Sequence, residues 1–191
     1  MDKIPKALAH FLFKNIHKPL LFSEEVETFT GYCTANVRTL YSRGHLTLPN
    51  TPLTGRGVKI QYSMFDVIEI MAYSELSRLG VHPSFRGAWK DNKPLAISIA
   101  NCVFDHLRAM SGDTKPRLRL VPGKADPEKI PPGSERYVLI YFDESIEGTW
   151  SMWTSNAMCD LETGGAARVI IDCLTLAVKA VDIFAQYGSR L

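Results

Sequence analysis

The sequence predicts an α+β protein whose first half is mainly helical and whose second half holds a short antiparallel sheet and a closing helix. Two observations predict this class. Apolar residues recur at helical spacing in several segments before residue 80, and two β-rich runs, 137–142 and 149–154, follow a proline-rich stretch. The chain has 191 residues, of which 46% are hydrophobic, so it can bury a core without disulfides. We expect two domains, at 1–90 and 91–191.

Two short helices separated by a glycine turn are predicted after an opening helix at about 4–17. Ser23 is the expected N-cap of the first short helix, which Gly31 ends. Thr34 is the expected N-cap of the second, which covers about 35–42. This arrangement is typical of a helix-turn-helix, although many other helical hairpins share it.

A small hairpin is predicted over residues 47–62. Its middle is rich in turn residues, with 55–57 at the tip, and its flanks alternate apolar and polar residues as strands do. Ser63 then caps a longer helix, with Asp66 as the acid of a capping box and Gly80 as the stop. The resulting order of helix, helix, hairpin and helix is that of a winged helix-turn-helix.

The second half of the chain is predicted to begin with a helix at about 93–110. A loop at 112–134 follows, because it contains five of the eleven prolines, and it includes one candidate strand at 118–121. Three further strands and an amphipathic helix complete the predicted α+β unit, at 137–142, 149–154, 168–171 and 174–187.

The charge distribution favours a polyanionic partner for the first half. Residues 1–90 carry 11 basic and 7 acidic side chains, a net charge of +4, whereas residues 91–191 carry 11 and 13, a net charge of −2. Residues 28–65 contain no acid, and the basic residues there are Arg38, Arg43, Arg56 and Lys59. Carboxylates near a phosphate weaken binding, so an acid-free basic stretch suits nucleic acid. Chance clustering on a solvated face is the alternative.

No catalytic, phosphate-loop or metal-binding motif is found in the sequence. There is no H-E-x-x-H, no G-x-S-x-G and no G-K-[ST] loop, so we expect neither an enzyme nor a cofactor. No signal peptide or membrane span is expected, and we predict a cytoplasmic protein. The four cysteines form no C-x-x-C pair and are therefore expected to be buried, reduced thiols: Cys33, Cys102, Cys159 and Cys173.

An ordered series of motifs runs through residues 23–81: Val37-Arg38-x-Leu40-x-x-x-Gly44-x-Leu46, then Thr54-Gly55-Arg56-Gly57-x-Lys59-x-x-Tyr62-Ser63-x-x-Asp66-Val67, then Glu75-Leu76-x-x-Leu79-Gly80-Val81. This series resembles the MerR-type winged helix-turn-helix of bacterial and phage transcription regulators. The resemblance covers about 60 residues, and the order of its motifs is more specific than any one of them.

The resemblance implies that helix 34–43 enters the major groove and that the wing, 47–62, contacts the DNA backbone. Leu40 stands where the family usually has an aromatic residue, so the backbone contact expected there is lost or moves to Tyr41. The long coiled-coil helix through which such regulators often dimerise is missing, which leaves the dimer surface open. The residues expected to contact DNA are Thr34, Asn36, Arg38, Tyr41, Arg43, Arg56, Lys59 and Tyr62.

The function predicted from these observations is a sequence-specific, MerR-like transcriptional regulator that binds double-stranded DNA as a homodimer. One alternative is an architectural or excisionase-like protein of a mobile element that bends DNA. Another is a small-molecule binding protein whose site in the second half is lined by Tyr141, Trp150 and Trp153, beside the acidic loop 143–147. The operator, an effector and the sign of regulation are left open by the sequence.

Overall fold

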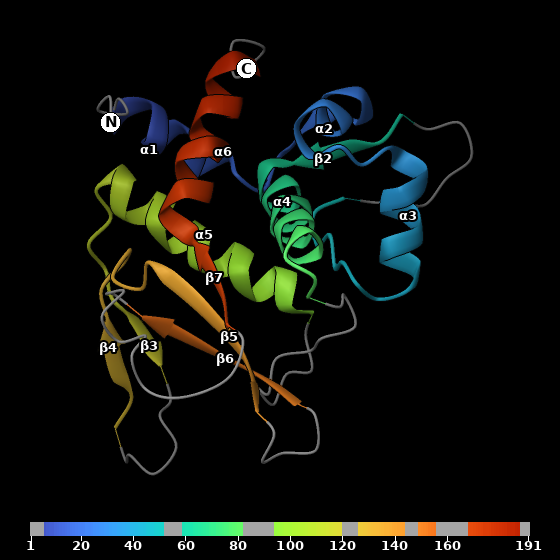
Figure 1. Ribbon diagram of the computed structural model, residues 1–191. Coiled ribbons are helices and arrows are strands. Elements are labelled where there is room, and N and C mark those ends of the chain that lie inside the picture. The colour runs from blue at the N-terminus through green and yellow to red at the C-terminus, as the bar shows by residue number, and fades with distance from the viewer. Residues whose placement is uncertain are drawn as a thin grey trace.

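The computed structural model has a mixed α+β fold, which confirms the predicted class (Figure 1). It describes residues 6–51, 59–81, 94–119, 126–143, 149–155 and 168–187. This part of the chain contains six helices and three small antiparallel sheets, two of two strands and one of three.

The first half contains four helices and two short strands: α1 (Lys6–Asn15), β1 (Pro19–Phe22), α2 (Ser23–Thr30), α3 (Thr34–Ser42), β2 (Gln61–Ser63) and α4 (Met64–Arg78). Gly31 ends α2 in the left-handed region, at φ 75°, where a residue without a Cβ is favoured. The predicted capping box of α4 is confirmed, because Ser63 Oγ accepts a hydrogen bond from the Asp66 N–H at 3.1 Å.

The predicted hairpin partner of residues 58–62 is wrong. Leu46–Pro49 forms no strand, and β2 instead pairs antiparallel with β1, with Leu21 opposite Tyr62. The physical reason is that the backbone N–H groups of Thr47 and Leu48, which a strand would donate to its neighbour, donate instead to the Glu69 carboxylate of α4. The expected tip of the wing lies outside the described residues.

The second half contains two helices and five strands: α5 (Leu95–Ser111), β3 (Arg117–Arg119), β4 (Glu128–Ile130), β5 (Tyr137–Asp143), β6 (Thr149–Ser155), β7 (Arg168–Asp172) and α6 (Cys173–Tyr187). The three-stranded sheet has the order β6-β5-β7 and is antiparallel throughout. Strand β4, which pairs with β3, falls in the stretch that the sequence predicted as loop.

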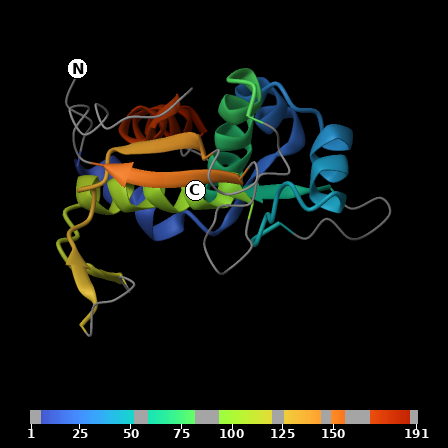
Figure 2. The same ribbon diagram turned by 60° about the horizontal axis from the view of Figure 1, so that its bottom comes forward.

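One hydrophobic core runs through both predicted domains. Helix α5 packs against α1, α4 and α6, and its Val103 and Leu107 are fully buried. Val138 and Ile140 of β5 join the same core. Both views place α3 at the edge of the molecule, far from the three-stranded sheet, so one side of this helix faces solvent (Figures 1 and 2).

The cysteines of the described segments are unpaired, as expected of reduced thiols. Cys102 and Cys173 are buried, but Cys33 is only partly buried, which differs from the prediction. Cys159 lies outside the described residues. Among the described helices, none has both the length and the apolar character needed to cross a membrane.

Candidate nucleic-acid interface

Helix α3 presents a polar, basic face to solvent. Its sequence, TANVRTLYS, turns one side toward the protein, where Val37 is fully buried and Leu40 is partly buried. Four of the predicted contact residues, in this helix and directly after it, are exposed: Asn36, Arg38, Tyr41 and Arg43. The fifth, Thr34, is half-buried. A nine-residue helix that packs against the protein through one apolar stripe leaves its other side free for a partner.

The turn between α2 and α3 fixes the direction of α3. Gly31 donates its N–H to the carbonyl of Glu27 at 2.8 Å, which closes α2, and α3 begins three residues later. Tyr32 in this turn packs edge-on against Tyr73 of α4, with 5.7 Å between the ring centres. The start of α3 is therefore anchored on the long, buried helix of the domain.

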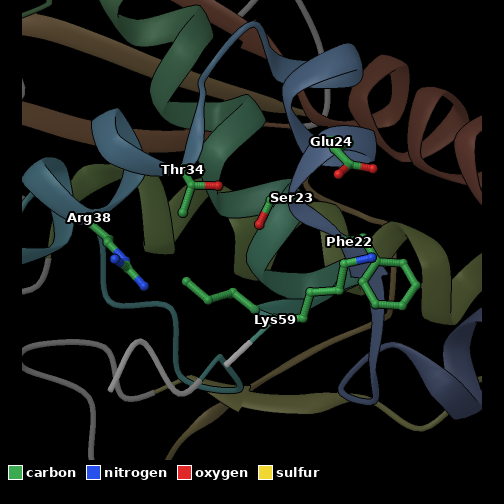
Figure 3. Close-up of a pocket in the computed structure, with 7 residues that line it drawn as sticks. Phe22, Ser23, Glu24, Thr34, Arg38 and Lys59 are labelled. Carbon is green, nitrogen blue, oxygen red and sulfur yellow. The ribbon is translucent and has the colours of Figure 1, made fainter. Parts of the chain in front are cut away.

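A pocket of about 240 Å³ lies between the starts of α2 and α3 and the segment that leads into β2 (Figure 3). Its lining joins three stretches of chain that are separate in sequence. The residues that line it are Phe22, Ser23, Glu24, Thr34, Arg38, Lys59 and Ile60.

Two cations flank this pocket. Figure 3 shows the Arg38 guanidinium directed toward the pocket from α3. The Lys59 ammonium lies on the other side, 4.9 Å from the centre of the Phe22 ring. Arg38 forms no hydrogen bond or ion pair with any residue that the structure describes. The Glu24 carboxylate is on the rim and points away from Arg38 (Figure 3).

Neither short helix has the predicted side-chain cap. Ser23 and Thr34 are the first helical residues, and the N-cap positions belong to Phe22 and Cys33, which provide no capping side chain. The hydroxyls of Ser23 and Thr34 point toward one another across the pocket instead (Figure 3). At the start of α2 negative charge is already present, because the Glu25 carboxylate accepts a hydrogen bond from the Phe22 N–H at 2.8 Å and Glu24 lies in the same turn. The first turn of α3 contains no acid.

Tyr62 does not lie on the surface as predicted. Its side chain is 0% exposed, so the expected direct contact of its hydroxyl with a DNA phosphate is wrong. Tyr62 follows Gln61 in β2, and the pairing of β2 with β1 turns it inward. Its hydroxyl has no hydrogen-bond partner among the described residues.

The Tyr62 hydroxyl lies near two of the hydroxyls that line the pocket, although Tyr62 is not itself part of the lining. Burial raises the pKa of Tyr62, and the nearby hydroxyls of Ser23 and Thr34 and the charge of Arg38 act in the opposite direction. The groups that influence this hydroxyl therefore include three of the residues that line the pocket.

Two carboxylates of α4 hold the chain between α3 and β2. The Asp66 carboxylate accepts a hydrogen bond from the Thr51 hydroxyl at 2.6 Å, and Glu69 binds Thr47 and Leu48. Both acids are fully buried in the first turns of an apolar helix. Sequence reasoning predicted only the capping role of Asp66, because nothing local distinguishes Glu69 from a surface glutamate.

The other predicted site residues are not brought to this pocket. Arg56 lies outside the described residues. Tyr141, Trp150 and Trp153 belong to the paired strands β5 and β6, in the other half of the molecule (Figure 2). The sequence reading missed Phe22, Glu24 and Ile60 in the lining, and proposed Ser23 only as a cap; the pairing of β1 with β2 brings these segments together.

No group of three or more metal-ligating side chains occurs within the described ranges. A comparison with protein-family models finds no match to this chain, and a comparison with the curated proteins finds none either.

Proposed function

We propose that this protein binds double-stranded DNA and reads its sequence with α3. One observation carries the proposal: Arg38 on the exposed face of α3 and Arg43 directly after the helix form no ion pair with any described residue, and they lie within a stretch of 38 residues that contains no acid. Such a face attracts a polyanion, and α3 itself carries no carboxylate that would repel phosphates.

The geometry of α3 supports insertion into a groove. The major groove of B-form DNA is about 12 Å wide and admits one α-helix. Val37 and Leu40 fasten the inner side of α3, so Asn36 and Arg38 are free to approach base edges. In this role Arg38 contacts guanine O6 and N7, and Asn36 pairs with adenine.

The segment before β2 supplies a second contact to the duplex. Lys59 lies across the pocket from Arg38, so a strand that meets one cation passes near the other. Contacts of this kind set the register of the protein on DNA and carry no sequence information. The wing tip with Arg56 extends this contact in our proposal.

We propose a winged helix-turn-helix regulator that acts as a homodimer. The short turn between α2 and α3, followed by the segment through β2 and by α4, supports this assignment. A two-fold dimer requires two half-sites, and reading heads of this type are spaced by about 34–36 Å or a multiple of it.

Selection from a library of randomised duplexes tests the proposal directly. Using the full chain, we expect enrichment of a motif with two-fold symmetry and an affinity that falls steeply with salt. Circular permutation of the selected site then measures bending, and strong bending at several adjacent sites favours an architectural protein instead. A library that stays random after selection contradicts sequence-specific binding.

A further inference from the structure

We propose that strand β7 is the dimer surface of this protein. The β7 strands of two copies pair antiparallel about a two-fold axis at Ile170, and the pairing joins their two sheets into one. This inference rests on the proposed function, which requires a homodimer and leaves its surface open. The molecule that occupies the surface is a second copy of this chain.

Strand β7 has one unused edge. It is the last strand in the order β6-β5-β7, and no strand in the described part of the chain pairs with its other side. At the end of the ladder, Cys173 donates its N–H to the Arg136 carbonyl at 2.9 Å. Because bonded residues alternate along an antiparallel ladder, Val169 and Ile171 also bond to β5, and Ile170 directs its N–H and C=O away from it. A row of such unused groups is a template for another strand.

The side chain of Ile170 is exposed at the centre of this strand. It is 38% exposed, whereas its neighbour Ile171 is 4% exposed, because successive residues of a strand face opposite sides of the sheet. Pairing of two copies at this position brings the two Ile170 side chains together and removes apolar surface from water.

The sequence of β7, RVIID, is complementary to itself in the antiparallel direction. When Ile170 stands opposite Ile170 of the second copy, Arg168 stands opposite Asp172 of that copy. Opposite charges directly across two strands favour pairing, and like charges oppose it. Because the axis is two-fold, the arginine–aspartate pair occurs twice.

Asp172 can join this pair without leaving its partners in its own chain. Its Oδ1 atom accepts the N–H groups of Leu174 and Thr175 at the start of α6. Its Oδ2 atom accepts only from Arg136 among the described residues, at 2.7 Å, and the side chain remains 26% exposed. A carboxylate oxygen has room for a further donor, so an arginine of a second copy adds to the existing ion pair.

Other edges that no described strand occupies lack this complementarity. Strand β6, on the opposite side of the same sheet, has the sequence TWSMWTS and carries no charged residue. Strand β3, paired with itself about Leu118, would place Arg117 opposite Arg119, and like charges oppose pairing. Pairing through β7 also leaves α3 free for DNA, because both views place α3 far from the three-stranded sheet (Figures 1 and 2).

Sedimentation equilibrium of the full chain without DNA tests the surface. We expect a monomer–dimer equilibrium with a micromolar dissociation constant, because one short strand pair buries less than the roughly 1,200–2,000 Å² of stable interfaces. We expect Ile170→Lys to weaken the dimer at least tenfold, since it places two ammonium groups at the axis. Leu118→Lys is the matched control, because it introduces the same charge at an exposed residue of β3 and leaves the dissociation constant unchanged.

A second variant tests the charge complementarity of β7. Arg168→Glu places two acids opposite one another on each side of the axis, so we expect it to weaken the dimer at least tenfold, whereas Arg168→Lys keeps most of the affinity. Circular dichroism of each variant, at a concentration where wild type is monomeric, verifies that the fold is retained.

Disulfide crosslinking tests the register. In a Cys33→Ser, Cys159→Ser background, Ile170→Cys should form an intermolecular disulfide with oxidised glutathione as the oxidant. The Cα atoms of a bonded antiparallel pair are about 5.5 Å apart, which lies within the range that a disulfide spans. Leu118→Cys in the same background is the control and should crosslink far more slowly.

Three results would overturn the surface: a wild-type chain that stays monomeric at millimolar concentration, a dimer that Ile170→Lys and Arg168→Glu leave intact, or Ile170→Cys crosslinking no faster than its control. Each of them leaves DNA reading by α3 standing, because fluorescence anisotropy with a selected duplex measures that separately. Dimerisation that depends on Ile170, in a chain that binds no duplex, refutes the proposed function and retains the surface.

Discussion

The Glu69 carboxylate holds Thr47 across 22 positions of the sequence. One carboxylate oxygen accepts a hydrogen bond from the Thr47 N–H at 2.6 Å, and the Thr47 hydroxyl lies 3.0 Å from both oxygens. The second oxygen accepts the Leu48 N–H at 2.9 Å. Because Glu69 is fully buried, these bonds compensate for the water it has lost, and they attach the end of the α3 region to α4.

Replacement of Glu69 by glutamine should destabilise the fold. The amide can accept at one end, but at the other it presents donors to N–H groups that already need an acceptor. We expect Glu69→Gln to lower the free energy of unfolding by about 1–3 kcal/mol, the usual cost of leaving a buried polar group unsatisfied. Urea unfolding followed by circular dichroism measures it. The control is Glu75→Gln, because Glu75 forms a surface pair with Arg78 at 2.8 Å and such pairs contribute about 0–1 kcal/mol. Equal stability of Glu69→Gln and wild type would contradict a stabilising role of the hydrogen bonds from Thr47 and Leu48 to Glu69.

The contribution of Glu69 should depend on pH with a definite sign. Burial raises the pKa of Glu69, and the hydrogen bonds from Thr47 and Leu48 only partly oppose this. A raised pKa in the folded state means that the folded protein binds this proton more tightly than the unfolded chain. The resulting stabilisation is fully present below the unfolded pKa and is lost as pH rises through the folded pKa.

Comparison with Glu69→Gln isolates this effect from other carboxyl groups. We expect wild type to gain stability relative to the variant as pH falls from neutral toward about 4.5, the usual range of a glutamate pKa. Free energies of unfolding at several pH values measure the difference. A difference that shrinks on acidification would contradict the raised pKa.

Asp172 should show the opposite behaviour at the start of α6. Its carboxylate accepts the N–H groups of Leu174 at 3.0 Å and Thr175 at 3.2 Å and pairs with Arg136 at 2.7 Å. Burial acts to raise the pKa of Asp172, but the bonds from Arg136 and Thr175 outweigh it and lower the pKa. We expect Asp172→Ala to cost about 0.5–2 kcal/mol, the range for a lost N-cap. The cost is present above the unfolded pKa and is lost as pH falls through the folded pKa. An unchanged unfolding midpoint at neutral pH would disprove the capping role.

The cysteines should differ in their reactivity. Cys33, just before α3, is partly exposed, whereas Cys102 and Cys173 are buried. In a Cys159→Ser background we expect one thiol per chain to react rapidly with a chromogenic disulfide reagent in the native state, and three to react in urea. Rapid native reaction of all three thiols would be inconsistent with the packing of α5 against α6. The Cys33→Ser variant assigns the fast thiol.

Local signals predicted the helices of the first half well. Gly31 and the Ser63–Asp66 capping box mark their ends by backbone requirements that any sequence must meet. The caps proposed at Ser23 and Thr34 were displaced by one residue, because the helices begin there and both hydroxyls face the pocket.

Local sequence patterns did not predict which segments distant in the sequence would pair. Residues 46–49 alternate like a strand, yet their donors are taken by Glu69, whose inward direction depends on the packing of α4. Strand β1 begins at Pro19 and is only four residues long, so no pattern identified it as the partner of β2. The same pairing buried Tyr62, which sequence reasoning had placed against DNA. The exposure of Arg38 could be predicted, because it depends only on its position next to Val37, the buried residue of the same helix.

The affinity of the Arg38→Ala variant for a selected duplex tests the central claim most directly. Fluorescence anisotropy at fixed salt, with Lys179→Ala as the charge-matched control, measures the dissociation constants for the selected site and for a site with the contacted guanine replaced. We predict that Arg38→Ala weakens binding to the selected site by on the order of 1–3 kcal/mol and removes the preference for guanine, while the control does neither. Unchanged affinity and unchanged preference in Arg38→Ala would show that α3 does not read the DNA.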